Sequence, residues 1–584
     1  MRALQYLNKY LKKYFLKLLL GIVITIISRV FSLFAPRLIG DSLTAVENYL
    51  VNHQGNLAAL KSLLLSNILI IIGATLISGF FTFLMRQTII NVSRFIEFDL
   101  KNEIFSHYLR LNQSFYKNNR TGDLMSRISE DVSKVRMYVG PAIMYSINTV
   151  TLFLCVITIM FSIAPKLSVY TLIPLPFLSI TIYKLSRVIN AKSTVVQEML
   201  SKLSSFTQET FSGISVIKSY GLEANTHQNF DILALEAKEK NMNLVKVQAW
   251  FFPLMILLIG LSNLIVIFIG GQQYMDGIIE IGVLAEFIIY INMLTWPVAV
   301  VGWVTSIVQQ AEASQKRINA FLNETIEIQD GPGVDVAVQG EISFDNVSLV
   351  YPETQIKALD GISFKVGRGK SLGVIGKVGS GKSSILHLIN RLYNPDSGNI
   401  LLDDNNIRDF KLQKLRSHIG NVPQNAFLFS ENIEENIRLG KQNATEEEII
   451  EASKKAVIHK NIKKFKQGYK TLLGERGLTL SGGQIQRVSI ARALIKDPQI
   501  LLLDDCLSAV DTDTEEKILK NLKEFSQNKT TIIVSHRISS VKDADHVILL
   551  ERGKIIEQGE HHKLIDLKGF YFDLFNKQQN EKEY

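Results

Sequence analysis

Gly376-Lys377-Val378-Gly379-Ser380-Gly381-Lys382-Ser383 fits the pattern G-x-x-x-x-G-K-[S/T] at every fixed position. In this pattern the backbone amides of a glycine-rich loop surround phosphates, the lysine adds a positive charge, and the hydroxyl binds Mg²⁺. The apolar stretch 371–375 predicts a buried strand that enters the loop, and 384–392 predicts the helix that leaves it. This context favours a phosphate site in an α/β domain over a glycine turn that binds nothing.

Two further apolar stretches end in polar residues that suit the same site. The strand expected at 501–503 is followed by Asp504 and Asp505, and the strand expected at 532–535 is followed by His536. Strands of a doubly wound parallel sheet end at one edge, so these side chains should lie near the glycine loop. Buried carboxylates are costly without a cation, so Asp504 is predicted to hold Mg²⁺ with Ser383.

The first half of the chain has the composition of a membrane domain. The protein is 47% hydrophobic, and its mean hydropathy is positive. A bilayer span needs about 17 to 25 apolar residues. Six runs of this kind occur, near 15–38, 63–85, 139–163, 166–185, 250–270 and 280–304. We therefore predict an all-α domain of six spans over 15–320.

Charge orients the predicted spans. The connection 86–136 holds nine Lys and Arg residues and 184–246 holds eight, whereas 271–279 holds none. The positive-inside rule places the two basic connections, and both chain termini, in the cytoplasm. Residues 1–14 are predicted to form an amphipathic helix at the membrane interface. The formal net charge of +9 is then explained by anionic lipid, so no nucleic-acid partner is expected.

The soluble part is delimited by a change in pattern. Asp330-Gly331-Pro332-Gly333 interrupts the helical pattern, so 321–340 is predicted to be a linker. Strand-like alternation begins after Gly340 and slips by one residue near Asn346, which predicts a bulge. The α/β domain is placed at 341–576, and 577–584 is taken as a polar tail.

Between the glycine loop and the paired aspartates stands Leu480-Ser481-Gly482-Gly483-Gln484. The order of these motifs resembles that of the ATP-binding cassette family, and the resemblance covers essentially the whole chain. It implies an α/β cassette with a helical subdomain that binds ATP with Mg²⁺. In the family, residues that match Ser481 and Gly483 contact the γ-phosphate on a partner's glycine loop. A membrane domain fused ahead of the cassette is similar to exporters, which implies a half-transporter that works as a dimer.

The resemblance also implies roles for single residues. Tyr351 would stack on adenine, Gln424 would contact Mg²⁺ and the attacking water, and His536 would contact the γ-phosphate. The implied ATP-binding set is Tyr351, Gly376, Lys377, Val378, Gly379, Ser380, Gly381, Lys382, Ser383 and Ser384, with Asp505, His536 and Gln424 as catalytic residues. The implied loop at the dimer axis consists of Ser508, Ala509, Val510 and Asp511. The implied coupling segments, which would contact the cassettes, contain Gly122, Asp123 and Gly213. Gly474–Gly477 resembles a family segment that touches the transmembrane loops.

One residue departs from the family pattern. The position after the Mg²⁺ aspartate is usually Glu, and here it is Asp505, which is one methylene shorter. A misplacement of about 1 Å can cost on the order of a hundredfold in rate. This site should therefore hydrolyse ATP slowly while the intact pentapeptide completes a partner's site, which is similar to one half of heterodimeric multidrug exporters. A homodimeric lipid or glycolipid flippase and an ATP-gated regulatory or channel-like subunit are the alternatives.

Two ionisable residues lie within the predicted spans. Arg29 and Glu286 fall at similar depth, so they either pair with each other or face a translocation cavity. The sequence predicts an ATP-driven exporter half of the bacterial inner membrane for an amphipathic drug, lipid or peptide. It does not identify that substrate.

Overall fold

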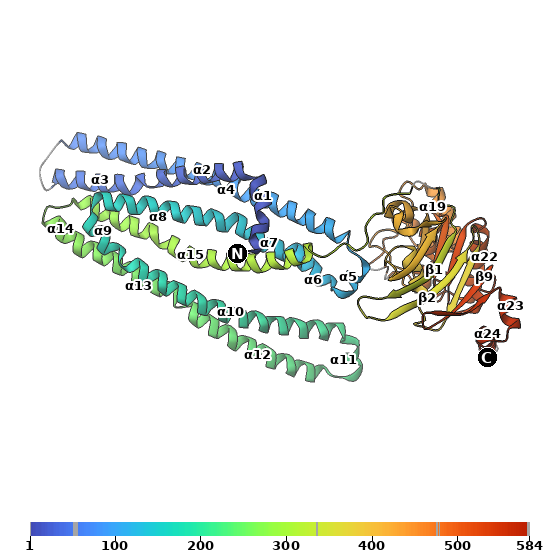
Figure 1. Cartoon of the computed structure of the whole chain (residues 1–584). Coiled ribbons are helices and arrows are strands. Elements are labelled where there is room, and N and C mark those ends of the chain that lie inside the picture. The colour runs from blue at the N-terminus through green and yellow to red at the C-terminus, as the bar shows by residue number, and fades with distance from the viewer. Residues whose placement is uncertain (1, 51–55, 335–336, 475–476, 478, 581–584) are drawn as a thin grey trace. The chain divides into compact units, whose positions relative to one another are not determined.

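The computed structural model describes residues 2–50, 56–334, 337–474, 477 and 479–580. The chain forms two compact units (Figure 1). The first comprises Met1–His107 and Gly122–Asn323, and the second comprises Tyr108–Thr121 and Glu324–Tyr584. The first unit is helical, and the second contains both sheets of the protein's described part.

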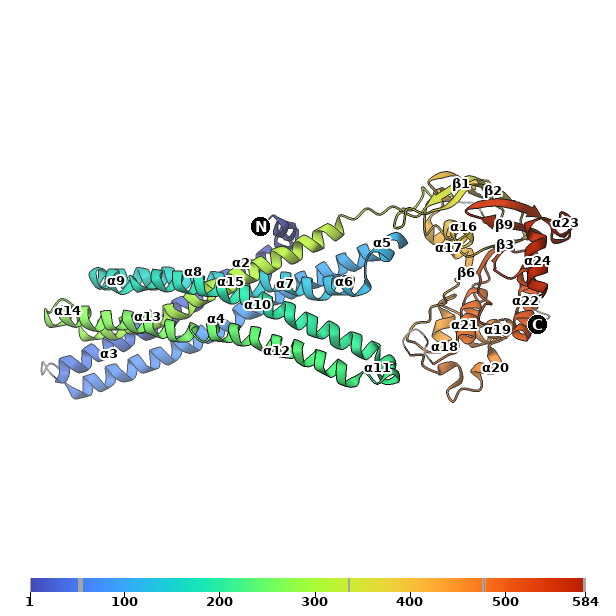
Figure 2. The same cartoon turned by 90° about the horizontal axis from the view of Figure 1, so that it is seen from below.

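In the described part of the chain six helical segments, all before Asn323, are long and apolar enough to cross a membrane, which confirms the expected six spans (Figures 1 and 2). The segments are Phe15–Leu50, Leu57–Tyr108, Thr121–Ile163, Pro165–Ser212, Glu223–Met275 and Ile281–Leu322. A helix of 52 residues, such as α4 (Leu57–Tyr108), measures about 78 Å at 1.5 Å per residue. This length is more than twice the roughly 30 Å of bilayer hydrocarbon, so such helices extend well beyond the membrane.

Several of these segments are built from more than one regular element. Single π-helical turns, which often mark irregular points in longer helices, interrupt the third and fifth segments at Arg127–Asp131, Tyr138–Ala142 and Val266–Gly270. The remaining elements are η1 (Ala3–Leu7), α1 (Asn8–Lys13), α2 (Phe15–Ser32), α3 (Phe34–Leu50), α6 (Thr121–Ser126), α7 (Val132–Met137), α8 (Ile143–Ile163), α9 (Pro165–Leu172), α10 (Pro174–Ser212), α11 (Ile214–Tyr220), α12 (Glu223–Gln248), α13 (Phe251–Ile265), α14 (Gly271–Met275) and α15 (Ile281–Leu322).

The N-terminal helix packs against protein. The apolar face expected at the membrane interface consists of Leu4, Leu7, Tyr10 and Leu11; the first three are buried, and Leu11 is partly exposed. The Tyr6 hydroxyl donates to Glu103 of α4 at 2.7 Å, and Lys9 donates to the same carboxylate. The buried side chains of this face pack within the protein; the location of the segment at the membrane interface stays a prediction.

Helices α3 and α15 approach each other closely at two glycines. A Cβ on Gly282 would lie 2.1 Å from the carbonyl oxygen of Gly40, and the Gly282 amide donates to Thr44 Oγ1 at 3.2 Å. Only glycine leaves room for the two backbones at this distance.

The cassette in the second unit contains two sheets. One has the strand order β2-β1-β4-β5, and the other has the order β10-β9-β3-β8-β7-β6. The strands are β1 (Ile342–Val350), β2 (Lys357–Val366), β3 (Ser371–Gly376), β4 (Ser397–Leu402), β5 (Asn405–Asn406), β6 (Ile419–Val422), β7 (Ile500–Asp504), β8 (Thr530–Val534), β9 (His546–Glu551) and β10 (Lys554–Gly559). Asn346 lies at a register shift of β1 with φ 47°, which confirms the expected bulge.

Helices complete the cassette around two apolar cores. One core includes β1, β2, β3 and α16 (Lys382–Ile389), and the other joins α18 (Ile433–Arg438), α19 (Glu446–Lys455) and α21 (Gly482–Leu494) to β7. The second core belongs to the expected helical subdomain. The other helices are α5 (Gln113–Asn118), η5 (Ile407–Asp409), α17 (Leu412–Ser417), α20 (His459–Ile462), η6 (Gly468–Lys470), α22 (Thr512–Phe525), η8 (Ile538–Ser540), α23 (His561–Asp566) and α24 (Phe570–Asn580).

Candidate ATP site

The larger sheet brings the predicted site residues to one edge. Strands β3, β8 and β7 are parallel, with Val374 opposite Val534 and Asp504 also opposite Val534. The glycine loop after β3, the aspartates at the end of β7 and the histidine after β8 therefore lie at the same carboxyl edge. In open α/β sheets this edge is where ligands bind.

The conformation of the loop depends on its glycines. Gly379 has φ 81° and Gly381 has φ 98°, which are left-handed values that side chains rarely adopt. A Cβ on Gly381 would also lie 2.2 Å from the carbonyl oxygen of Ala358. The loop thus curves tightly before α16 begins at Lys382.

Lys382 is buried at the centre of the loop. Its ammonium donates to the carbonyl oxygens of Gly376 and Lys377, both at 2.9 Å, and only 6% of the residue is exposed. Burial lowers the pKa of Lys382 to about 8, because the charged form loses solvent. An anion here would supply the counter-charge that the carbonyl groups do not provide.

Ser383 and Asp504 form a pair of oxygen ligands suited to Mg²⁺. The Ser383 hydroxyl donates to Asp504 Oδ1 at 2.9 Å. Burial raises the pKa of Asp504, and a divalent cation would relieve this cost. In the described part of the chain no three His, Cys, Asp or Glu side chains cluster as metal ligands. A cation that takes few protein oxygens and keeps water and phosphate oxygens fits this pair.

Tyr351 lies beside the loop in an aromatic group. Its hydroxyl is 2.8 Å from Ser384 Oγ and 3.1 Å from His387 Nδ1, and its ring meets Tyr393 edge-on. Lys117 of α5, in the same compact unit, places its ammonium 4.6 Å from the Tyr351 ring centroid and 2.9 Å from Glu353. Sequence reasoning did not find Lys117, because a basic residue in a basic loop carries no distinguishing signal.

Asp505 and His536 complete the edge of the sheet. Asp505 has φ 41°, and its amide donates to Val534 O at 2.8 Å. The His536 Nδ1 atom is 3.4 Å from the Lys382 ammonium. Burial, followed by the charge of Lys382, lowers the pKa of His536. Gln424 follows β6 at the same edge and is exposed.

The pentapeptide Leu480–Gln484 begins helix α21. Ser481 is its N-cap, with Gln484 N donating to Ser481 Oγ at 3.4 Å and Ser481 N donating to Gln484 Oε1 at 2.9 Å. This reciprocal capping box satisfies two amides that the first turn leaves free. Ser481 is nevertheless exposed, so it is accessible to a partner.

The predicted dimer-axis loop packs against the pentapeptide of the same chain. A Cβ on Gly483 would lie 2.7 Å from the carbonyl oxygen of Ala509, and the Ala509 amide donates to Gln486 Oε1 at 3.2 Å. Asp511 caps α22 by accepting from the Thr514 amide at 3.0 Å. Gln486 was missed by the sequence analysis; its position one turn into α21 was the only available signal.

The predicted coupling segments contain short helices, α5 and α6 in the first and α11 in the second. Gly122 and Asp123 lie in α6, and Gly213 separates α10 from α11. The segment Gly474–Gly477 includes residues 475 and 476, which lie outside the described part of the chain.

Arg29 and Glu286 have different partners. Arg29 Nε donates to Asn148 Oδ1, and Glu286 accepts a hydrogen bond of 2.6 Å from Tyr290. Glu286 is buried, with 4% of the residue exposed. Their mutual pairing, one of the two alternatives left open by the sequence, is not present among the described ion pairs.

An α/β ATPase domain fused to six membrane-crossing helices defines a class of protein, the ATP-driven membrane transporters. The family models for the ABC transporter transmembrane region and for ABC transporter match residues 18–298 and 359–508. The probable multidrug resistance ABC transporter ATP-binding/permease protein YheI of Bacillus subtilis is 34% identical over 553 residues, which cover 94% of this chain and 93% of YheI. The multidrug resistance-like ATP-binding protein MdlA of Escherichia coli is 35% identical and covers 85% of both chains.

A solved structure supports the same assignment. The structure of a bacterial Atm1-family ABC exporter with ATP bound superposes with a TM-score of 0.79 at 26% identity and covers 98% of this chain and 99% of that one. The chain belongs to the ABC transporter family. It is an exporter-type transport ATPase with an ATP-binding domain.

Proposed function

We propose that this chain is one half of a dimeric exporter of the bacterial inner membrane, which uses ATP with Mg²⁺ to move an amphipathic drug, lipid or peptide outward. The names of the relatives support a multidrug type of substrate. Lys382 would hold the phosphates, and Ser383 with Asp504 would hold Mg²⁺, which neutralises phosphate charge when bound. Gln424 and His536 would orient the attacking water and the γ-phosphate.

We further propose that the chain is the slow-site half of a heterodimer. The observation that supports this proposal is Asp505, whose backbone lies in the left-handed region at φ 41°. Asp tolerates this region better than most residues, but its carboxylate reaches one methylene less far than that of Glu. The pentapeptide, by contrast, keeps its capping box and an exposed Ser481. The partner would then be a second half-transporter with a faster site.

Lengthening the residue at position 505 tests this proposal. Asp505→Glu is expected to accelerate ATP hydrolysis at this site at least about tenfold, because general-base positioning contributes on the order of 10²–10⁴ in rate. Asp505→Asn has the original length without the base and serves as the matched control. Steady-state ATPase activity of the purified transporter is measured with Ser481→Arg also present in this chain, which blocks the partner's site, so that turnover reports on this chain's own site. If Asp505→Glu left turnover unchanged or lower, the shortened base would not be what limits this site.

The proposed orientation places both termini and the two basic connections in the cytoplasm. A membrane-impermeant thiol reagent should label a cysteine at Asn56 from outside the cell and a cysteine at Asn118 only after permeabilisation. Both asparagines are exposed, and the two native cysteines can first be replaced. The opposite pattern would reverse the topology and, with it, the direction of transport.

A further inference from the structure

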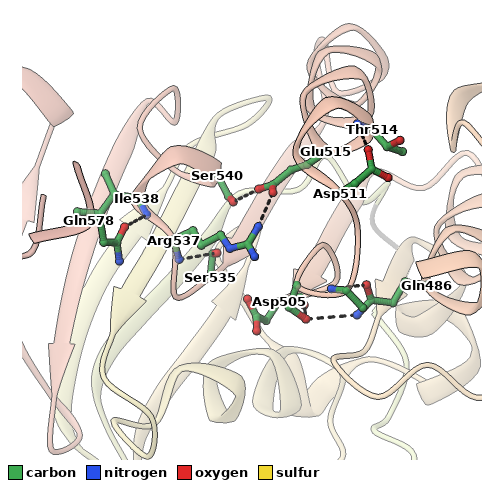
Figure 3. A network of polar contacts seen from close by, with 12 residues as sticks. Gln486, Asp505, Asp511, Thr514, Glu515, Ser535, Arg537, Ile538, Ser540 and Gln578 are labelled. Carbon is green, nitrogen blue, oxygen red and sulfur yellow. Dashed lines mark hydrogen bonds and ion pairs between the residues drawn. The ribbon is translucent and has the colours of Figure 1, made fainter. Parts of the chain in front are cut away.

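The backbone on both sides of Arg537 is held by one side chain from the end of the chain. Gln578 Nε2 donates to the carbonyl oxygen of His536 at 2.7 Å. The Ile538 amide donates to Gln578 Oε1 at 2.8 Å (Figure 3). A single carboxamide therefore bridges residues 536 and 538 as a neighbouring strand would. Both groups of the amide are used, so the orientation of the side chain is defined.

Helix α24, which carries Gln578, is firmly docked on the cassette. Its first turn is capped by Glu557, which accepts from the amides of Phe570 and Tyr571 at 2.6 and 3.0 Å. Tyr571 is fully buried in a core with Ile538, and Leu574 and Phe575 pack against that core. Gln578 follows Tyr571 by two helical turns and lies on the same face. The helix is thus a rigid support for the amide rather than a loose end.

A second contact holds the same loop from the opposite side. The Arg537 guanidinium donates to Glu515 Oε2 at 2.7 Å, and Ser540 Oγ donates to Glu515 Oε1 at 2.8 Å (Figure 3). Glu515 is buried in α22, the helix that Asp511 caps. Residues 536–540 are therefore fixed between the C-terminal helix and the helix that follows the dimer-axis loop.

We propose that Gln578 is a positioning residue for His536. Its two hydrogen bonds set the backbone orientation from which the His536 imidazole reaches the edge of the sheet beside Lys382. Ile538 remains anchored by its apolar packing and by its carbonyl oxygen, which accepts from the amides of Val541 and Lys542 at 3.0 and 2.9 Å. Without Gln578 the chain would therefore stay folded while the peptide group after His536 could rotate. The inference rests on the catalytic role proposed for His536, and it predicts that the C-terminal helix contributes to turnover rather than to ATP binding.

The test uses the full-length transporter in which this chain carries Asp505→Glu together with Ser481→Arg, which blocks the partner's fast site, so that turnover reports on this chain's own site. If this chain hydrolyses ATP when purified alone, the chain alone carrying Asp505→Glu is used. Gln578→Leu removes both hydrogen bonds, and Gln578→Glu keeps the acceptor for Ile538 but loses the donor to His536. Each change is expected to lower kcat about tenfold and to leave the KM for ATP within about twofold, because a small misplacement affects the reaction more than binding. Gln579→Leu, on the exposed face of the same helix, is the matched control and should be unchanged.

A double-mutant cycle separates positioning from general stabilisation. In a His536→Ala background, measured with radiolabelled ATP, Gln578→Leu should cause no further loss, because its effect is transmitted through His536. Three results would overturn the proposal. They are an equal additional loss of turnover in the His536→Ala background, an effect of the Gln578 substitutions on KM alone, and unchanged turnover of both Gln578 variants. If the slow-site hypothesis fails, Asp505→Glu will not accelerate ATP hydrolysis, and this result is separate from the effect of Gln578. The ratio of kcat between each Gln578 variant and its parent would still be measurable.

Discussion

Lys382→Ala is expected to weaken ATP binding by at least about a hundredfold, because hydrogen bonds to charged groups contribute about 1.5–3 kcal/mol each and the ammonium can donate several. In the described structure this ammonium already faces the inside of the glycine loop and donates to two backbone carbonyl groups. Alanine removes the buried positive charge and leaves those carbonyl groups without their donor. A binding titration with ATP and Mg²⁺ on the purified protein measures the change.

Lys377→Ala is the matched control for this experiment. Lys377 belongs to the same loop, but 85% of its side chain is exposed, so its charge is screened by solvent. We expect the affinity of Lys377→Ala for ATP to change less than about fivefold, since exposed ion pairs contribute at most about 1 kcal/mol and the substitution keeps the backbone amide of the loop. Asp505→Asn should also keep its affinity. Equal affinities for Lys382→Ala and the unchanged protein would refute the assignment of the phosphate site.

The edge of the parallel sheet could be predicted from sequence because its functional residues directly follow short apolar strands. Asp504 ends β7, and His536 follows β8 after one serine. Strand β8 pairs in parallel with β3, and β7 pairs in parallel with β8, so both side chains are brought to the edge where the glycine loop lies. Local spacing was sufficient here, since the strands are buried on both faces and can pair in few ways.

Side chains that depend on distant partners were harder to predict. Arg29 and Glu286 lie at similar depth in the predicted spans, but depth does not determine which neighbouring helix a side chain faces. Arg29 donates a hydrogen bond to Asn148, and Glu286 accepts one from Tyr290. Gln578 was placed in a polar tail from 577, whereas α24 continues to Asn580. Its spacing of seven residues from the buried Tyr571 was the signal that a docked helix extends that far.

Ser481→Arg is expected to reduce the ATPase activity of the assembled transporter by about a hundredfold or more, because removing or blocking a donor to developing phosphate charge costs on the order of 10²–10³ in rate. Ser481 is exposed at the start of α21, where a partner's γ-phosphate would be contacted, and an arginine there fills that space. The substitution also removes an N-cap, which costs about 1 kcal/mol of stability. Thr445→Arg removes an equivalent capping box from α19 at an exposed position and is the matched control.

Comparison with Asp505→Ala then distinguishes the two kinds of dimer. In a heterodimer this chain's own site is the slow one, so Asp505→Ala should lower the total ATPase activity less than about twofold, because little turnover depends on it. Ser481→Arg should still be severe, since it acts on the partner's fast site. In a homodimer both substitutions fall on every site, and both should be severe. Robust ATPase activity of this chain purified alone, lost on Asp505→Ala, would decide for the homodimer, because no other chain could then supply the catalytic carboxylate.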